Sequence, residues 1–506
     1  MKVRPFRNRF YGGAGGDSLS AMRKWLTASV WLATTSPALT APPPNLLVIM
    51  TDNHGEWTLG CYGNRDIATP NIDRLAADGM LFSRAFANNA VCSPTRATFL
   101  TGLMPSGHGV HCFLGTQGLQ MGPVARNAMQ ELRTLPEVLA ARGYECGLIG
   151  KWHLGDNLRP QEGFTTWVTM PHGATATFHD AEVIENGGVR KEPSHLTEFW
   201  TRRAIEFIER PRERPFFLML TYNGPYGLGR SMLEEPRNRH AGRYAGEPPA
   251  CFPREPMHPW LHATTNLFYS ATARRRYASE ISGIDDGVGE VLAALKRRGL
   301  DGRTTVILTA DQGLACGQHG LWGMGDHTRP LSAFEWTMRV PLIWRHAGRI
   351  PVGQKADIMV SHCDAMPTIL DWLGFPDDLP RDPPRPGRSY AAALEGKPLP
   401  GWDNVIFFEF ENVRAIRTDR WKYVERIHEG PNELYDLAAD PDERRNLAQD
   451  PAYDAPRKQL GDRSRAFFQR YADPKWDLWN GGRSKSNLMT RQLFALPNPE
   501  REPAKF

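Results

Sequence analysis

The chain has 506 residues, of which 41% are hydrophobic and 23% charged, and its 47 Gly and 41 Pro show no repeating period. This excludes a fibrous or wholly disordered protein and predicts one large domain with a smaller companion. The net charge of +5 suits an anionic small substrate, but the sequence lacks the basic stripe of a nucleic-acid binder. Seven cysteines without a C-x-x-C pair indicate neither a disulfide scaffold nor a structural zinc site.

Residues 1–44 have the pattern of a processing segment. From Met22, basic residues precede a short apolar stretch at 25–33, which small residues up to Ala41 follow. This order resembles a secretory signal peptide and predicts a periplasmic or secreted protein. The alternative is a disordered tail on a cytoplasmic protein. Neither this stretch nor any other is long and apolar enough to predict a membrane span.

Beyond Pro44, short apolar runs alternate with longer amphipathic runs, the pattern of parallel strands joined by helices. The apolar runs predict strands at 46–50, 147–150, 216–221, 304–309 and 340–344. The amphipathic runs predict helices at 70–75, 134–142, 194–210 and 274–298. We therefore predict an α/β fold over residues 45–375, with a large, mainly parallel sheet flanked by helices.

Two further segments complete the predicted organisation. Residues 225–270 show little periodicity and predict a long surface insertion, whose basic residues are either a polyanion contact or an ordinary solvated face. The Pro-rich stretch 374–388 marks a domain boundary. After it, strands at 405–410, 414–418 and 422–426 and a helix at 456–471 predict a smaller C-terminal α+β subdomain within 376–506.

Polar side chains follow several of the predicted strands. Asp52 and Asn53 come after the first strand, and Asp311 and Gln312 come after the strand at 304–309. Because ligands bind at the carboxyl ends of strands in open α/β sheets, we expect these groups to converge. Their oxygen atoms suit Ca²⁺ or Mg²⁺ better than zinc. The alternative is that the aspartates only cap the segments that follow them.

Cys92 stands at the start of a predicted helix, with Pro94 in the first turn and Arg96 close behind. A cysteine at a helix N-terminus beside an arginine is suited to anionic chemistry. A buried, inert cysteine is the competing interpretation.

The motifs together resemble the type I sulfatases of the alkaline-phosphatase superfamily. The resemblance runs in matching order from residue 45 to about 448. It rests on Asp52-Asn53, Gly60-Cys61-Tyr62-Gly63, Thr69-Pro70-Asn71-Ile72-Asp73-Arg74-Leu75, Cys92-Ser93-Pro94-Thr95-Arg96, Gly150-Lys151-Trp152-His153-Leu154-Gly155, Thr309-Ala310-Asp311-Gln312-Gly313, His319-Gly320-Leu321-Trp322, Arg339-Val340-Pro341-Leu342-Ile343 and Glu433-Leu434-Tyr435-Asp436-Leu437. The Cys-x-Pro-x-Arg signature is highly specific in this context.

The resemblance implies that an activating enzyme oxidises Cys92 to formylglycine, whose hydrated aldehyde attacks sulfur. The second hydroxyl of the hydrate then expels sulfate. By the same resemblance, Asp52, Asn53, Asp311, Gln312 and the modified Cys92 would bind a divalent metal, Ca²⁺ or Mg²⁺. Arg96 and Lys151 would stabilise the diol and the sulfuryl oxygens, and His153 would handle the diol proton and contact the substrate.

The sequence departs from the family at the group that assists the leaving alcohol. Tyr226 stands where many sulfatases have histidine, and Met324 stands where a lysine is common. Tyr226, His319 and His327 are therefore the candidates for this role or for substrate contact. A phenol is a poor general acid near neutral pH.

The sequence thus predicts an enzyme that hydrolyses a sulfate ester, with a sulfated small molecule or oligosaccharide as substrate and a carbohydrate sulfate favoured. A phosphonate monoesterase or phosphodiesterase of the same superfamily is the first alternative. The second is a non-catalytic protein that binds sulfated glycans.

Overall fold

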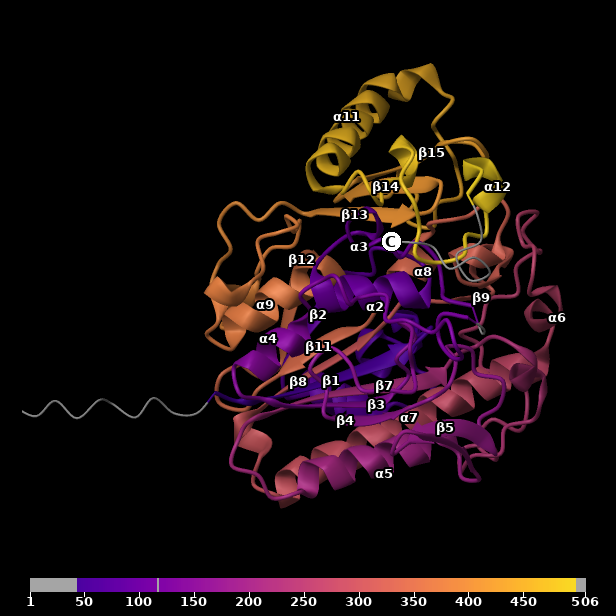
Figure 1. Ribbon diagram of the computed structural model, residues 1–506. Helices are drawn as coiled ribbons and strands as arrows, with labels where there is room; N and C mark the ends of the chain where they lie inside the picture. The colour runs from indigo at the N-terminus through magenta and orange to yellow at the C-terminus, as the bar shows by residue number, and fades with distance from the viewer. Residues whose placement is uncertain (1–42, 116–117, 497–506) are drawn as a thin grey trace, which may run out of the picture. The chain divides into compact units, whose positions relative to one another are not determined.

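The computed structural model describes residues 43–115 and 118–496, so the predicted signal segment falls almost entirely outside the described residues. A ten-stranded sheet forms the centre of the molecule, in the order β12-β2-β11-β8-β1-β7-β3-β4-β5-β6 (Figure 1). Its strands are β1 (Asn45–Asp52), β2 (Met80–Phe86), β3 (Glu145–Gly150), β4 (Thr166–Thr169), β5 (Ala181–Glu185), β6 (Gly188–Glu192), β7 (Phe216–Pro225), β8 (Thr304–Ala310), β11 (Leu342–Arg345) and β12 (Gln354–Ser361).

Helices cover both faces of this sheet. One face carries the long α5 and α7, and α2, α4 and α9 lie on the opposite side (Figure 1). The α-helices are α1 (Pro70–Ala77), α2 (Cys92–Thr101), α3 (Pro105–His108), α4 (Leu135–Ala141), α5 (Leu196–Glu209), α6 (Thr265–Phe268), α7 (Ala271–Arg297), α8 (Glu335–Met338), α9 (Ala365–Trp372), α10 (Ala391–Leu394), α11 (Asp454–Tyr471) and α12 (Arg491–Phe494).

β1 shows why the sequence forms a two-sided core. Its residues are all buried, and successive side chains point to opposite faces of the sheet. Leu47 and Ile49 belong to the core that includes side chains of α5 and α7, whereas Leu46, Val48 and Met50 belong to the core that includes those of α4 and α9. A continuous apolar run is therefore required here, as expected for a strand covered on both faces.

The predicted α/β architecture is confirmed, and the sheet is mixed. β1 pairs in parallel with β7 and β8, and β3 pairs in parallel with β7 and β4. β11, at the position predicted as one more strand of the alternation, runs antiparallel to β8 and β2. β4, β5 and β6 form an antiparallel edge that the periodicity did not indicate.

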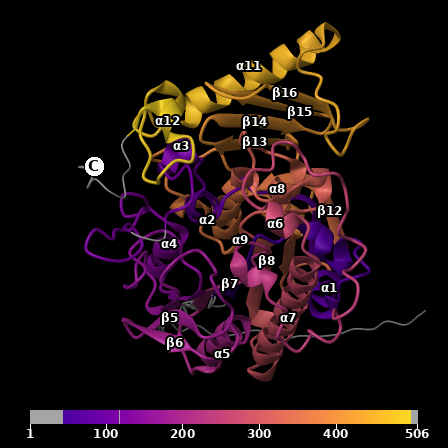
Figure 2. The same cartoon turned by 90° about the vertical axis from the view of Figure 1, so that its right-hand side faces the viewer.

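The C-terminal part contains a four-stranded antiparallel sheet with α11 above it (Figure 2). Its strands are β13 (Val405–Phe410), β14 (Val413–Thr418), β15 (Trp421–Arg426) and β16 (Glu433–Asp436). The described residues from Pro43 onward pack as one compact unit. The boundary near residue 375 between a catalytic domain and a smaller C-terminal subdomain stays a prediction. No helix in the described ranges is long and apolar enough to cross a bilayer.

The segment between β7 and α6 contains little regular structure, and part of it packs against α7. Asn238 Nδ2 donates to Ser279 O at 2.9 Å, and the Tyr244 hydroxyl lies 2.7 Å from Ser282 Oγ. Arg239 and His240 both pair with Asp286 on α7. These two basic side chains are thus compensated by an acid of the same protein, which favours the solvated-face interpretation for them.

Candidate active site

The carboxyl ends of β1 and β8 bring the predicted acidic residues together with Cys92. Asp52 ends β1, and Asp311 follows β8 directly. These strands pair in parallel along β1, so their ends meet at one edge of the sheet. One ligand atom each of Asp52, Cys92 and Asp311 lie within 4.8 Å of one another, and all three residues are buried. The predicted convergence is confirmed for these residues.

Two cationic side chains close this cluster. Lys151 Nζ lies 2.6 Å from Asp52 Oδ2, and both side chains are inaccessible to solvent. Arg96 donates to Asp311 Oδ2 through Nε at 3.1 Å and Nη2 at 2.8 Å. Arg96 also donates to the Lys151 carbonyl at 2.8 Å, which ties the two cations into one arrangement. Buried charges require such partners, because desolvation of an unpaired charge costs several kcal/mol.

Cys92 opens α2, as predicted, and the helix ends at Thr101 before Gly102, whose φ is 70°. Every residue of α2 is buried. The Cys92 thiol faces Asp52 Oδ1 at 3.4 Å, and Gln312 Nε2 donates to its sulfur at 3.2 Å. Burial and the adjacent Asp52 carboxylate raise the pKa of this thiol well above its usual value, although Lys151 opposes the shift. An unmodified Cys92 would therefore stay protonated and be a poor nucleophile.

The two amide side chains occupy the same cluster in different orientations. Asn53 turns Oδ1 toward the centre, 3.9 Å from Cys92 Sγ, and its Nδ2 donates to the Tyr226 carbonyl at 2.8 Å. Gln312 turns Nε2 toward Asn53 Oδ1, while its Oε1 accepts from Thr95 Oγ1 at 3.1 Å. Asn53 thus presents the oxygen expected of a metal ligand, and Gln312 presents its nitrogen. A half-turn of the Gln312 amide would exchange its two atoms.

Four predicted site residues have backbones in the left-handed region. Asn53 and His319 have φ 57°, His153 and Tyr226 have φ 62°, and each lies within three residues of a strand end. Non-glycine residues seldom adopt this conformation, and functional sites are where it accumulates. Local sequence patterns carry no signal for it.

The two carboxyl groups differ in their electrostatics. Burial and the nearby Asp311 raise the pKa of Asp52, against the opposing effects of Lys151 and Arg96. Burial would also raise the pKa of Asp311, but Arg96 and Lys151 outweigh it and lower the pKa below its usual value. The protein's own cations therefore compensate Asp311 more completely than Asp52, and a further cation beside Asp52 would be stabilised.

This donor set fits a hard divalent cation. Two buried carboxylates and the Asn53 amide oxygen face one point, which is the ligand chemistry that Ca²⁺ and Mg²⁺ prefer. In the described part of the chain this is the one cluster of at least three acidic, histidine or cysteine side chains with such spacing.

His153 lies beside the cluster in a neutral state. Its Nε2 lies 3.0 Å from the Leu114 carbonyl and donates to it, so Nδ1 keeps its lone pair. Burial lowers the pKa of His153 well below 6.5, and the Lys151 charge adds to this effect. His172 on the neighbouring loop also acts on His153 electrostatically. Sequence reasoning missed His172, because no motif surrounds it.

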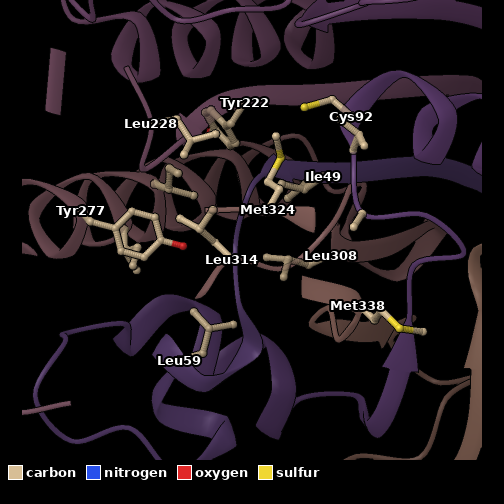
Figure 3. Packing of buried hydrophobic residues seen from close by; sticks show 14 of the residues in the cluster. Ile49, Leu59, Cys92, Tyr222, Leu228, Tyr277, Leu308, Leu314, Met324 and Met338 are labelled. Atoms are coloured by element: carbon tan, nitrogen blue, oxygen red, sulfur yellow. The ribbon is translucent and has the colours of Figure 1, made fainter. Parts of the chain in front are cut away.

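Tyr226 and Met324 lie beside the cluster, and His327 lies next to Met324. The Tyr226 ring has Lys151 Nζ 5.7 Å from its centroid, and Met324 Sδ accepts from Gln312 Nε2 at 3.1 Å. Cys92 and Met324 thus share one amide nitrogen. Figure 3 shows these two residues within one cluster of buried side chains. His327 Nδ1 lies 2.6 Å from Asp326 Oδ1 and 3.3 Å from the Met324 backbone nitrogen.

His319 is placed differently. Its ring stacks on Phe334 with centroids 4.5 Å apart and lies edge-on to His258. Among the described residues, no hydrogen bond or ion pair joins it to Asp52, Cys92 or Asp311. The structure therefore brings ten of the eleven predicted site residues into one connected network and leaves His319 outside it.

Comparison with known proteins decides the family. The sulfatase family model matches residues 44–375, and a model described as the C-terminal part of N-sulphoglucosamine sulphohydrolase matches residues 322–469. The chain belongs to the sulfatase family. An N-acetylglucosamine-6-O-sulfatase of Bacteroides thetaiotaomicron is 25% identical to this sulfatase over 494 residues, covering 82% of this chain and 85% of the relative.

Other matches agree with this assignment. An N-acetylgalactosamine-6-sulfatase of Sus scrofa is 30% identical over 400 residues, covering 71% of this chain and 68% of the relative. A solved structure, of a protein in complex with its substrate D-glucosamine-2-N,6-O-disulfate, matches with a TM-score of 0.68 at 23% identity and covers 85% of this chain and 98% of that one. At this identity the structural match shows the shared fold, and the family membership inferred from the motifs is confirmed.

Proposed function

We propose that this sulfatase hydrolyses the sulfate ester of a carbohydrate to an alcohol and free sulfate. The observation that carries the proposal is the enclosure of Cys92 between two buried carboxylates, which Lys151 and Arg96 flank. This arrangement offers a place for a nucleophile, a hard cation and fixed positive charges around one tetrahedral anion. The names of the relatives support a sugar sulfate as the substrate class.

The chemistry requires two further groups, a bound cation and a modified form of Cys92. A divalent cation, Ca²⁺ or Mg²⁺, bound by Asp52, Asn53, Asp311 and a turned Gln312, would polarise the sulfate oxygens. Formylglycine, made from Cys92 by a formylglycine-generating enzyme, would supply the nucleophilic hydroxyl.

The side chains around the cluster then have separate tasks. Arg96 and Lys151 hold positive charge where the sulfuryl oxygens gain negative charge, and neither needs to reorganise, because each is fixed by a carboxylate. His153 keeps a free lone pair on Nδ1 that would accept the proton of the nucleophile, and burial, which lowers its pKa, makes it a weak base for this task.

Of the three candidates for the leaving-group acid, we assign His327. Its Nδ1 accepts from the Met324 backbone amide at 3.3 Å, which leaves Nε2 as the ring nitrogen that carries a proton to donate. Its side chain is 15% exposed, so the ring is not sealed inside the core. Burial raises the pKa of Tyr226 far above neutrality, so its phenol would donate a hydrogen bond and release no proton.

Initial rates on matched aryl sulfate, phosphonate and phosphodiester substrates test the reaction class. We expect the sulfate ester to be hydrolysed fastest, and faster turnover of the phosphorus esters would establish the phosphonate monoesterase or phosphodiesterase alternative. Mass spectrometry of the Cys92 peptide, after expression with the generating enzyme, tests the nucleophile. A persistent thiol in active protein would refute it, and a thiol in inactive protein would favour the glycan-binding alternative.

We further propose that the enzyme acts in the periplasm or outside the cell. The basic, apolar and small residues within 1–44 support export. Fractionation of cells that express the full chain, with N-terminal sequencing of the product, tests this. Recovery of uncleaved protein in the cytoplasm would contradict it.

A further inference from the structure

Three cationic side chains gather around one carboxylate, away from the Cys92 cluster. Lys475 Nζ and Lys485 Nζ lie 3.5 and 3.7 Å from the same oxygen, Oε2 of Glu131. The Arg126 charge acts on Lys485 as well. Glu131 is 37% exposed, so water screens its charge. The buried Glu162 carboxylate also interacts electrostatically with Lys485, so the three cationic side chains stand beside two carboxylates.

Lys485 is the buried member of this group. Its side chain is 7% exposed, and its ammonium donates to the Ala128 carbonyl at 2.8 Å. An ammonium has three donors, and the Glu131 oxygen lies beyond hydrogen-bond distance. Burial lowers the pKa of Lys485 to about 8, and repulsion from Lys475 and Arg126 adds to this against the attraction of Glu131. The Trp476 ring also faces this ammonium, with its centroid 4.9 Å from Nζ, so an anion would add to the contacts that the ammonium already makes.

A small cavity opens at this ammonium. It has a volume of about 40 Å³ and is lined by Leu119, Arg126, Asn127, Ala128, Gln130, Glu131 and Lys485. A cavity holds one water from about 10–15 Å³ upward on the same measure, so this one has room for several waters or for one oxyanion group. Five of its seven lining residues have polar or charged side chains that could bind a charged ligand, although apolar atoms form the larger part of the lining.

The cavity is attached to the segment that carries Lys151 and His153. The Ala128 amide donates to the Leu154 carbonyl at 2.9 Å, and Leu154 follows His153 directly. The Asp156 amide donates to the Leu119 carbonyl, also at 2.9 Å. Ala128 therefore contacts Lys485 through its carbonyl and the catalytic segment through its amide.

We propose that this cavity, the Lys485 pocket, is a second oxyanion site that binds a sulfate or carboxylate group. A substrate with several anionic groups would place one of them here while another is hydrolysed at Cys92. Free sulfate released by the reaction has the same chemistry and is the other source. The substrate part of this inference rests on the proposed function, and the anion site itself does not.

Kinetics on a sulfated tetrasaccharide and on its monosulfated counterpart test the first source. In Lys485→Gln we expect KM for the multiply sulfated substrate to rise roughly 10-fold with kcat unchanged, because the lost contact serves ground state and transition state equally. KM for the monosulfated substrate should stay the same. Lys475→Gln, at a residue whose side chain is 44% exposed, should show the same pattern more weakly without affecting folding. Lys191→Gln, on the exposed edge strand β6, is the matched control.

Calorimetry with inorganic sulfate on the intact protein tests the second source without relying on activity. We expect two sulfate ions per chain in the unmodified protein and one in Lys485→Gln. Loss of one sulfate site with unchanged KM values would assign the pocket to free sulfate. Equal sulfate binding, together with KM changes that are equal for both substrates or absent, would overturn the proposal. A protein that hydrolyses no sulfate ester would contradict the proposed function alone, because the calorimetric comparison would still decide the pocket.

Discussion

The two sides of the active site are built differently. The reacting side consists of Asp52, Cys92, Arg96, Lys151 and Asp311, and its four charges form two buried pairs. The leaving-group side consists of Tyr226, Met324, Asp326 and His327 and contains a phenol, a thioether and one histidine–carboxylate contact. The reacting side matches the family motifs closely, and the leaving-group side departs from them.

This difference indicates which task constrains the sequence more tightly. Binding and attacking a sulfuryl group requires the same charges whatever alcohol is attached to it. Protonating that alcohol and accommodating its sugar depends on the particular substrate. The leaving-group side is therefore where we expect the substrate preference of this sulfatase to be determined.

Asp311→Asn should have the largest effect, because it alters the reacting side at its centre. Arg96 would lose its charged partner while staying buried, at a cost to stability of ~3–5 kcal/mol. With a metal ligand and a positioned cation both compromised, kcat/KM should fall by at least ~10⁴-fold. Steady-state kinetics and denaturant unfolding measure the two effects. Asp377→Asn, at an exposed position, is the control, and a loss of less than tenfold in Asp311→Asn would refute the assigned role.

His327→Gln should separate the two sides by leaving group. Turnover of a sugar sulfate should drop ~10²- to 10⁴-fold, because its alkoxide needs a proton in the transition state. Turnover of 4-nitrophenyl sulfate should change little, since nitrophenolate leaves unaided. Asp326→Asn should give a smaller version of the same pattern if that carboxylate orients the ring. Equal losses on both substrates would remove His327 from the role of acid.

Addition of Ca²⁺ or Mg²⁺ should stabilise the protein through the reacting side alone. At a concentration of ~100 times Kd, a bound ion contributes ~2.7 kcal/mol and raises Tm by a few degrees. Thermal unfolding after chelation, with and without each ion, measures this. The shift should vanish in Asp52→Asn and persist in His327→Gln. A metal-dependent shift of equal size in both variants would place the ion elsewhere.

Tyr226→Phe should have the smallest effect, at most ~3-fold in kcat for a sugar sulfate. The phenol keeps its proton, and the ring itself provides the face toward Lys151. Full pH–rate profiles of both proteins should overlap. A drop as large as that expected of His327→Gln would make Tyr226 the acid after all.

Much of the fold and of the reacting side could be predicted from the sequence. The apolar run of β1 requires burial on both faces, and Asp52 and Asp311 follow strands that pair in parallel, so their convergence follows from topology. β2 and the β4–β6 edge were missed because their apolar positions are set by neighbours far away in the chain. For the same reason no sequence pattern indicated that the Gln312 amide nitrogen faces Cys92 or that Asn53 and Tyr226 adopt positive φ.

By itself the sequence determined the alternation of strands and helices, the nucleophile position and the charged residues around it, because these depend on residue type and short spacing. Only the tertiary structure decided that His327 faces Asp326 while His319 stacks on Phe334, and that Lys485 lies next to Ala128, 357 residues earlier in the chain. Such contacts depend on how distant segments pack, and the free energy of a buried charge depends on the partners that packing provides.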